Sequence, residues 1–198
     1  MWMVLGERLS EGYLLYVDVI DDTGPLSAGV FTGLHLLFGR SPIAYILLGK
    51  IFVLVQIYYW NSTLIKYRVF DENTYLPAIV MAALFHFSFD LMYLSPTLLG
   101  STFLLLAFGQ LFSHTVLQKE SSESTLLIGI YGGLATGFHW NFVFFLPFIA
   151  FTGLAISSFT IRQLFLSIMG FLLPILLIFV FYLLLQVLHL QSNPLNLF

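Results

Sequence analysis

Three carboxylates lie close together in the stretch Gly12–Leu26, in a chain in which only 9% of the residues are charged. Asp18, Asp21 and Asp22 are spaced i, i+3, i+4, so that in a helix they would share one face. Carboxylate oxygens placed in this way could hold Mg²⁺ or Mn²⁺, and such a cation could screen a lipid pyrophosphate. The alternative is a hydrated loop in which Asp-Thr-Gly supplies turn chemistry without a metal. Asp18 and Asp21 are also candidates for a catalytic acid.

A lysine interrupts an otherwise apolar stretch between Ile43 and Tyr59. An ionisable group in the middle of a membrane span costs about 2.5–3.5 kcal/mol on insertion scales, so Lys50 should be paired or face a wet cavity. Lys50 could hold a lipid phosphate as a point charge. The alternatives are an ion pair with Asp90, which is itself a third candidate acid, or extension of the lysine to the interface.

Two further residues are candidates for binding a lipid phosphate. His139 is followed by Trp140 and Asn141, and this polar run interrupts a long apolar segment. A histidine there could bind a phosphate or exchange a proton, whereas the alternative is an aromatic anchor at the membrane interface. Arg40 is the other candidate, in a turn between two apolar segments.

The composition is typical of an integral membrane protein. Hydrophobic residues make up 59% of the chain and the mean hydropathy is +0.96, whereas soluble domains have roughly 45–50% apolar and about 25% charged residues. The chain has no cysteine, which excludes disulfides and thiolate metal sites. Its seven basic residues are scattered, so no basic patch favours nucleic acid as a partner.

The apolar pattern predicts an all-α fold with about six transmembrane helices and two N-terminal helices lying at the membrane surface. The surface helices are expected over residues 2–10 and 25–38, the second between Gly-Pro and Gly-Arg-Ser-Pro breakers. We expect three regions: a juxtamembrane acidic region at 1–41, a helical bundle at 42–191 and a tail at 192–198. The predicted spans are Ile43–Tyr59, Tyr75–Tyr93, Thr97–Phe112, Thr125–Phe138, Asn141–Ser157 and Leu164–Leu190.

The basic residues between the spans predict an orientation. The positive-inside rule is satisfied, with the predicted spans alternating in direction, if Lys66, Arg68, Lys119 and Arg162 are cytoplasmic. The outer face then carries Glu7, Glu11, Asp18, Asp21, Asp22, Asp90 and His139. We therefore expect a multi-pass membrane protein with its acidic N-terminal region on the outer side.

One pattern of charged, glycine, aromatic and proline residues runs through the first 41 residues: Glu7-Arg8-Leu9, Gly12, Leu15-Tyr16, Asp18, Asp21, Pro25-Leu26 and Leu37-Phe38-Gly39-Arg40-Ser41. This stretch resembles the first extracytoplasmic region of C-type polytopic glycosyltransferases, which include the protein mannosyltransferase-like and aminoarabinose-transferase-like enzymes. A second stretch, Gly129–Ala135, is similar to a GxxxGLA span of that group. The sequence resembles, more closely still, integral membrane proteins of Bacteroidota with the same architecture. The resemblance implies a bacterial inner membrane, with the acidic N-terminal region on the periplasmic side.

The resemblance implies binding of a polyprenyl-phosphate sugar at the outer leaflet. The family's catalytic acid aligns at or before Met1, and its usual arginine falls near Ile46, with Lys50 one helical turn further on. We therefore expect lipid or partner binding without intrinsic catalysis. The alternatives are a non-enzymatic scaffold subunit of a bacterial envelope complex and, more weakly, a transporter.

Overall fold

The computed structural model describes residues 2–88, 91, 93–117, 122–155 and 160–192, and within them all regular structure is helical apart from two isolated β-bridges. The all-α fold expected from the sequence is therefore confirmed for this part of the chain. The helices are α1 (Trp2–Ser10), α2 (Pro25–Phe38), α3 (Pro42–Lys66), α4 (Leu76–Phe87), α6 (Pro96–Leu117), α7 (Ser122–Phe138), the 3₁₀ helix η1 (Trp140–Phe144), α8 (Phe145–Ala155) and α9 (Ile161–Ser192).

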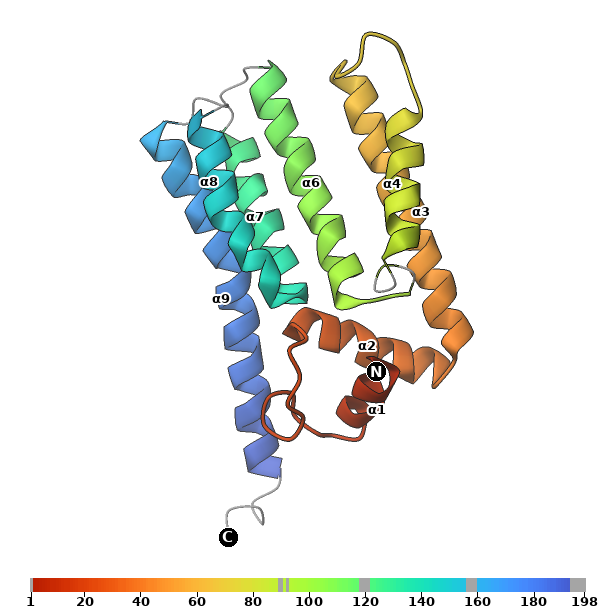
Figure 1. The fold of residues 1–198 in the computed structure, drawn as a ribbon. Helices are drawn as coiled ribbons and strands as arrows, with labels where there is room; N and C mark the ends of the chain where they lie inside the picture. The colour runs from red at the N-terminus through yellow and green to blue at the C-terminus, as the bar shows by residue number, and fades with distance from the viewer. Residues whose placement is uncertain (1, 89–90, 92, 118–121, 156–159, 193–198) are drawn as a thin grey trace.

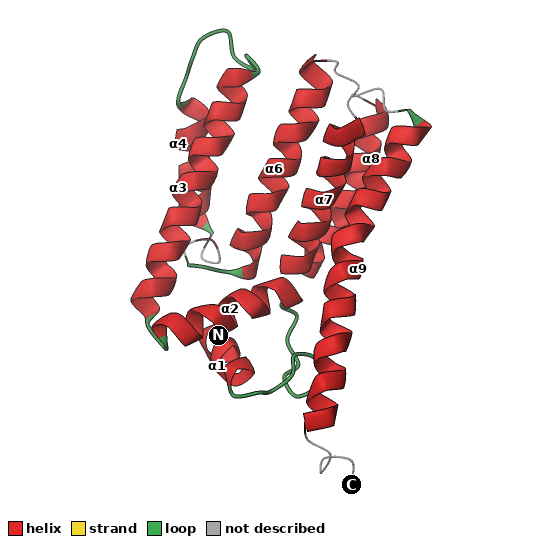
Figure 2. Cartoon of the chain, turned by 180° about the vertical axis from the view of Figure 1, so that it is seen from behind, coloured by secondary structure: helices red, strands yellow, loops and turns green. Residues whose placement is uncertain are grey.

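The longer helices form an up-and-down bundle. Helices α3, α4, α6, α7, α8 and α9 run roughly side by side in alternating directions, while α1 and α2 lie across one end (Figure 1). The view from behind shows that α9 continues past its neighbours and runs beside the loop that joins α1 to α2 (Figure 2). This loop, residues 11–24, is called the acidic loop below, and its end of the bundle is called the acidic end.

Three helices are long and apolar enough to cross a membrane: Pro42–Lys66, Pro96–Val116 and Ile161–Leu184. Six spans were expected. Three of them therefore have no helix of spanning length among the described residues. Helix α4 has 12 residues and therefore reaches only about 18 Å at 1.5 Å per residue, against roughly 30 Å of hydrocarbon. Helix α8 has 11 residues because η1 replaces its first turns.

Close backbone contact holds α7 against α9. A Cβ on Gly129 would overlap the Ser167 carbonyl, and one on Gly133 would overlap the Phe171 carbonyl. Only glycine permits this approach, as is common between membrane helices. Gly129 and Gly133 therefore serve close packing between α7 and α9.

The two N-terminal helices form a layer of their own. Gly6 of α1 lies directly against the Phe31 carbonyl of α2, and the Phe31 ring stacks on Tyr45 of α3 at 6.1 Å between ring centroids. Phe31 is completely buried. The buried apolar cluster around it includes Leu94 and Phe138. The acidic end is thus a packed cap on the bundle, joined to α3, to α7 and to the 93–95 segment.

Formal charge divides unevenly between the two ends of the bundle. In the described part of the chain the acidic end carries five carboxylates and two arginines, a formal excess of three negative charges. The opposite end carries three basic residues, Lys66, Arg68 and Arg162, and an equal number of acidic ones. Five of the eight carboxylates in the described part of the chain therefore lie at the acidic end, which carries the net negative charge. Which end faces the cytoplasm stays a prediction, and Lys119 lies outside the described residues.

Candidate functional site

The acidic loop is not helical, and two of its carboxylates are used to hold its backbone. Asp18 Oδ2 accepts a hydrogen bond from the Leu14 backbone N–H at 2.7 Å, and the Asp18 N–H donates to the Leu14 carbonyl at 2.9 Å. This closed turn fixes Tyr16 at a φ of 67°, a left-handed conformation that costs free energy for a residue with a side chain. Asp18 is therefore a structural residue of this turn.

Asp21 holds the second half of the loop. Its Oδ1 accepts hydrogen bonds from the Thr23 backbone N–H, at 2.8 Å, and from the Thr23 hydroxyl. This is the local turn chemistry that aspartate offers two residues before its donor. Asp22, in contrast, is exposed and forms no hydrogen bond or ion pair with a described residue.

The proposed metal site depended on a helix that the structure does not contain. Because residues 18–22 are turn and extended backbone, Asp18, Asp21 and Asp22 do not share one helical face. Among the described residues no group of three acidic or histidine side chains is placed to hold a metal ion. The spacing argument for Mg²⁺ or Mn²⁺ is therefore wrong, and the loop interpretation accounts for the positions of Asp18 and Asp21.

The acidic loop is attached to the bundle at the junction of α7 and η1. Thr23 forms a β-bridge with His139, and the Trp140 indole N–H donates to the Tyr16 hydroxyl at 3.1 Å. The Tyr16 hydroxyl in turn donates to the Thr23 carbonyl. These contacts connect the acidic loop to the break at His139, more than one hundred residues later in the chain. The sequence predicted the position of this break correctly.

The carboxyl end of α7 receives the start of α2. The Phe138 carbonyl accepts hydrogen bonds from the Gly24 N–H at 3.1 Å and from the buried Ser27 hydroxyl at 2.8 Å. The last carbonyls of a helix lack partners within the helix, so α2 satisfies one that would otherwise be left without a donor. A Cβ on Gly24 would overlap the Gly137 carbonyl, which explains why glycine precedes Pro25 here.

Helix α9 holds the loop from the other side. The Tyr182 hydroxyl donates to the Leu15 carbonyl, and the Tyr182 ring lies 5.8 Å from the Tyr16 ring between centroids. Burial is the largest cause that raises the pKa of the Tyr16 hydroxyl above its ordinary value; the hydrogen bond from Trp140 opposes this shift, whereas the charges of Asp21 and Asp22 add to it. Tyr16 is therefore kept neutral, in the form that can donate to Thr23.

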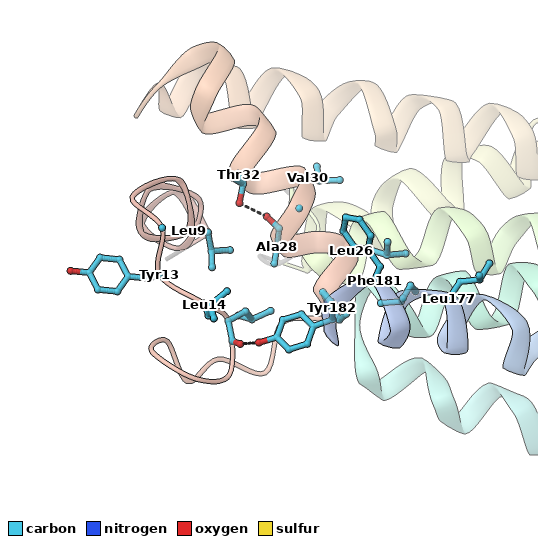
Figure 3. A pocket seen from close by; sticks show the side chains of 15 residues that line it. Leu9, Tyr13, Leu14, Leu26, Ala28, Val30, Thr32, Leu177, Phe181 and Tyr182 are labelled. Atoms are coloured by element: carbon cyan, nitrogen blue, oxygen red, sulfur yellow. Dashed lines mark hydrogen bonds between the residues drawn. The ribbon is translucent and has the colours of Figure 1, made fainter. Parts of the chain in front are cut away.

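An apolar groove lies beside this attachment, between the acidic loop, α2 and α9 (Figure 3). Its volume is about 1050 Å³. Its wall is formed by aliphatic and aromatic side chains that include Leu26, Leu177 and Phe181. Two of its polar groups are already used, because the Thr32 hydroxyl donates to the Ala28 carbonyl at 2.9 Å and the Tyr182 hydroxyl donates to Leu15.

The rim of the groove carries charge. Leu14 lines the groove, and its N–H is bound by Asp18, so the Asp18 carboxylate lies at the edge. Tyr13 also lines the groove, but Figure 3 shows its ring pointing away from the other lining side chains. The Arg8 guanidinium lies 5.5 Å from the centre of that ring and is paired with Glu11 at 3.2 Å. The groove is thus apolar inside, and one of its lining residues, Leu14, is bonded to the Asp18 carboxylate.

The predicted phosphate-binding residues are not gathered around the groove. Arg40 is paired with Glu7 of α1. Lys50 lies in α3 and forms no ion pair with a described carboxylate, and its proposed partner Asp90 lies outside the described residues. His139 is bound to Asn141 through Nε2 at 3.1 Å, and its buried Nδ1 has no hydrogen-bond partner. None of the three lines the groove, so their roles in phosphate binding stay predictions.

Sequence reasoning missed the residues that build the groove and fix its rim. Tyr16, Trp140 and Tyr182 are aromatic residues in an aromatic-rich chain, and nothing in their spacing connects them. Only the Asp21–Thr23 turn had a local signal, an aspartate two residues before a threonine. Comparison with protein-family models, with curated proteins and with solved structures finds no match to this chain.

Proposed function

We propose that this protein is a polytopic membrane protein that binds the hydrocarbon chain of a polyprenyl-linked lipid in the groove between α2 and α9. The groove itself is the observation that carries the proposal. Its volume of about 1050 Å³ is at the upper end of the range of small-molecule sites, which are likewise mostly apolar. An isoprenoid chain suits such an apolar wall, because the chain has no polar group that requires a hydrogen bond.

The position of the groove suits an amphipathic ligand. One wall is α9, whose segment Ile161–Leu184 is long and apolar enough to span a membrane. The rim is the acidic loop. A chain lying against Leu177 and Phe181 would bring its headgroup to the edge near Asp18. In this proposal the acidic end faces the periplasm.

The charges at the rim favour a glycosylated headgroup over a bare phosphate. Arg8 and Arg40 are each paired with a glutamate, whereas Asp18 and Asp22 form no ion pair with a described base. Sugar hydroxyls can donate hydrogen bonds to such carboxylates. A phosphate so close to them would be repelled unless a divalent cation lay between. The sequence resemblance to C-type glycosyltransferases supports the same ligand class.

The groove can be tested by filling it. Gly29 lines the groove, and a Cβ added there meets no atom within 4 Å. Gly29→Phe should therefore occupy the groove without disturbing α2, since replacing a helical glycine also favours the helix. Native mass spectrometry of the purified protein with a polyprenyl phosphate, a polyprenyl-phosphate sugar and a polyprenol should show lower occupancy for the variant with all three lipids.

A second glycine in the same helix is the control. Gly33 also has open space around a built Cβ but does not line the groove. Gly33→Phe should bind the three lipids as the wild type does. The proposal fails if Gly29→Phe binds them as tightly as Gly33→Phe. Tighter binding of the sugar-linked lipid than of the polyprenyl phosphate would support the role given to the rim carboxylates.

The scaffold alternative is favoured by one feature of α4. Its outward side chains Ile79, Leu84 and Phe87 are 64–85% exposed, and its main contact in the described chain is with α3. Such a helix could pack against a partner subunit. A complex of fixed subunit ratio that survives mild detergent and loses its partner when Leu84 is changed to serine would support this function instead.

A further inference from the structure

A small polar pocket lies between α3 and α6 at the end of the bundle opposite the acidic loop. Its volume is about 280 Å³. Eight of its nine lining residues carry a polar side chain, among them Ser62 and Lys66 of α3 and Gln110 and Ser113 of α6. The groove at the acidic end is lined mainly by apolar side chains. The two cavities therefore differ in the number of polar side chains that line them.

One positive charge lies in the lining of the pocket. Lys66 is its only charged lining residue, and no carboxylate lines it. Lys66 also forms no ion pair with a described acidic residue, although Asp71 and Glu72 follow in the same connection. Its ammonium lies 5.4 Å from the centre of the Tyr67 ring, so an aromatic face and not an anion is its neighbour. The pocket can therefore accept an anion without displacing an internal ion pair.

Neutral donors face the same space. The Ser62 and Ser113 hydroxyls and the Gln110 amide line the pocket and form no hydrogen bond with a described residue. Thr63 differs, because its hydroxyl already donates to the Tyr59 carbonyl at 2.8 Å. One ammonium, two free hydroxyls and an amide are the donors that an oxyanion with several acceptor oxygens needs.

The shape of the pocket depends on a glycine of α6. A Cβ on Gly109 would overlap the Tyr59 hydroxyl, so the Tyr59 ring lies directly on the α6 backbone. Tyr59, Gly109 and Gln110 all line the pocket. Trp60 and Tyr67 are close in sequence to this level of α3, as is typical of the lipid headgroup region.

We propose that this pocket binds a phosphate group, as the headgroup of an anionic phospholipid or as a free phosphate anion. Basic pockets between membrane helices are suited to anionic headgroups, and a phosphate fits a cavity of 280 Å³. Lys66 supplies the charge, and Ser62, Gln110 and Ser113 supply neutral donors. This site is independent of the groove and of the lipid proposed for it.

The test is a comparison of Lys66→Gln with the wild-type full chain in detergent. Native mass spectrometry with dioleoyl-phosphatidylglycerol should show binding about tenfold weaker for Lys66→Gln, as expected from loss of one charge-assisted contact. The double variant Ser62→Ala/Ser113→Ala should weaken binding by a smaller factor, whereas Lys66→Arg should retain it. Inorganic phosphate, tested by thermal shift on the same proteins, separates the two sources of the anion.

The matched control is Arg162→Gln, which removes a positive charge from the same end of the protein outside the pocket. Its binding should equal that of the wild type. Stabilisation by inorganic phosphate that depends on Lys66 identifies a free-anion site, and binding of phosphatidylglycerol alone identifies a headgroup site. Equal losses in Lys66→Gln and Arg162→Gln would overturn the proposal, as would unchanged binding in Lys66→Gln. Binding of dioleoylglycerol, which has no phosphate, as tight as that of phosphatidylglycerol would also overturn it.

Discussion

The hydroxyl of Tyr182 in α9 donates a hydrogen bond to the backbone carbonyl of Leu15, 167 residues earlier in the chain. This contact connects the far end of a helix of spanning length to the loop that carries the carboxylates. It also separates two cavities, since Tyr182 lines both the groove and a second apolar cavity of about 490 Å³ on the Tyr16 side. The position of the acidic loop is therefore set by an aromatic residue at the opposite end of the sequence.

Removing the Tyr182 hydroxyl should loosen the acidic loop. In Tyr182→Phe the ring remains, but the Leu15 carbonyl loses its donor, which should lower the free energy of unfolding by about 1 kcal/mol. Hydrogen exchange of residues 13–19 should become faster while that of α7 stays unchanged. Tyr75→Phe is the control, since Tyr75 is 73% exposed. Equal exchange in the two variants would mean that the hydroxyl does not hold the loop.

The approach of α2 to the end of α7 should depend on Gly24. In Gly24→Ala the new Cβ would overlap the backbone carbonyl of Gly137, and backbone cannot move aside as a flexible side chain can. Overpacking of this kind typically costs about 1–3 kcal/mol. Thermal unfolding in detergent should show a lower midpoint for Gly24→Ala than for the wild type. Gly29→Ala, where a Cβ meets open space, should unfold at or above the wild-type midpoint.

The boundaries of α2 could be predicted because their signals are local. Pro25 occupies the first turn of the helix, where its missing N–H costs nothing. Gly39 ends the helix with a φ of 57°, a conformation that glycine adopts readily. The break at His139 was visible for a similar reason, since a polar run interrupts an apolar segment.

The groove and the true span lengths could not be predicted in the same way. The groove is made by α2 and α9, which are far apart in the sequence, so no window of residues contains it. Helix α8 was expected to span because its residues are apolar, but η1 takes up the segment Trp140–Phe144 and shortens it. Hydropathy shows which residues avoid water. It does not show where the backbone changes from α-helical to 3₁₀ hydrogen bonding.

The carboxylates of the acidic loop should differ in their effect on stability. Asp21→Ala removes the acceptor of two Thr23 donors and should lower the free energy of unfolding by about 1 kcal/mol. Asp22→Ala should change it by less, because Asp22 is exposed. If the carboxylates only stabilise the loop and bind no cation, millimolar Mg²⁺ or Mn²⁺ should not change the difference in unfolding midpoint between the wild type and either variant. A Mg²⁺-dependent rise in the wild-type midpoint that Asp22→Ala abolishes would instead show a cation site.

Tyr16 should make stability depend on pH in the alkaline range. Because burial raises the pKa of its hydroxyl in the folded protein, the neutral form is favoured by folding. The contribution of neutral Tyr16 to the free energy of unfolding should be fully present below the ordinary tyrosine pKa of about 10. This contribution should be lost as the pH rises through the higher pKa of the folded state. Unfolding midpoints measured from pH 8 upward should therefore fall more steeply for the wild type than for Tyr16→Phe, which has no proton to lose. Since the other tyrosines and lysines titrate in both proteins, the difference between the two curves isolates Tyr16, and parallel curves would show that its ionisation is not linked to folding.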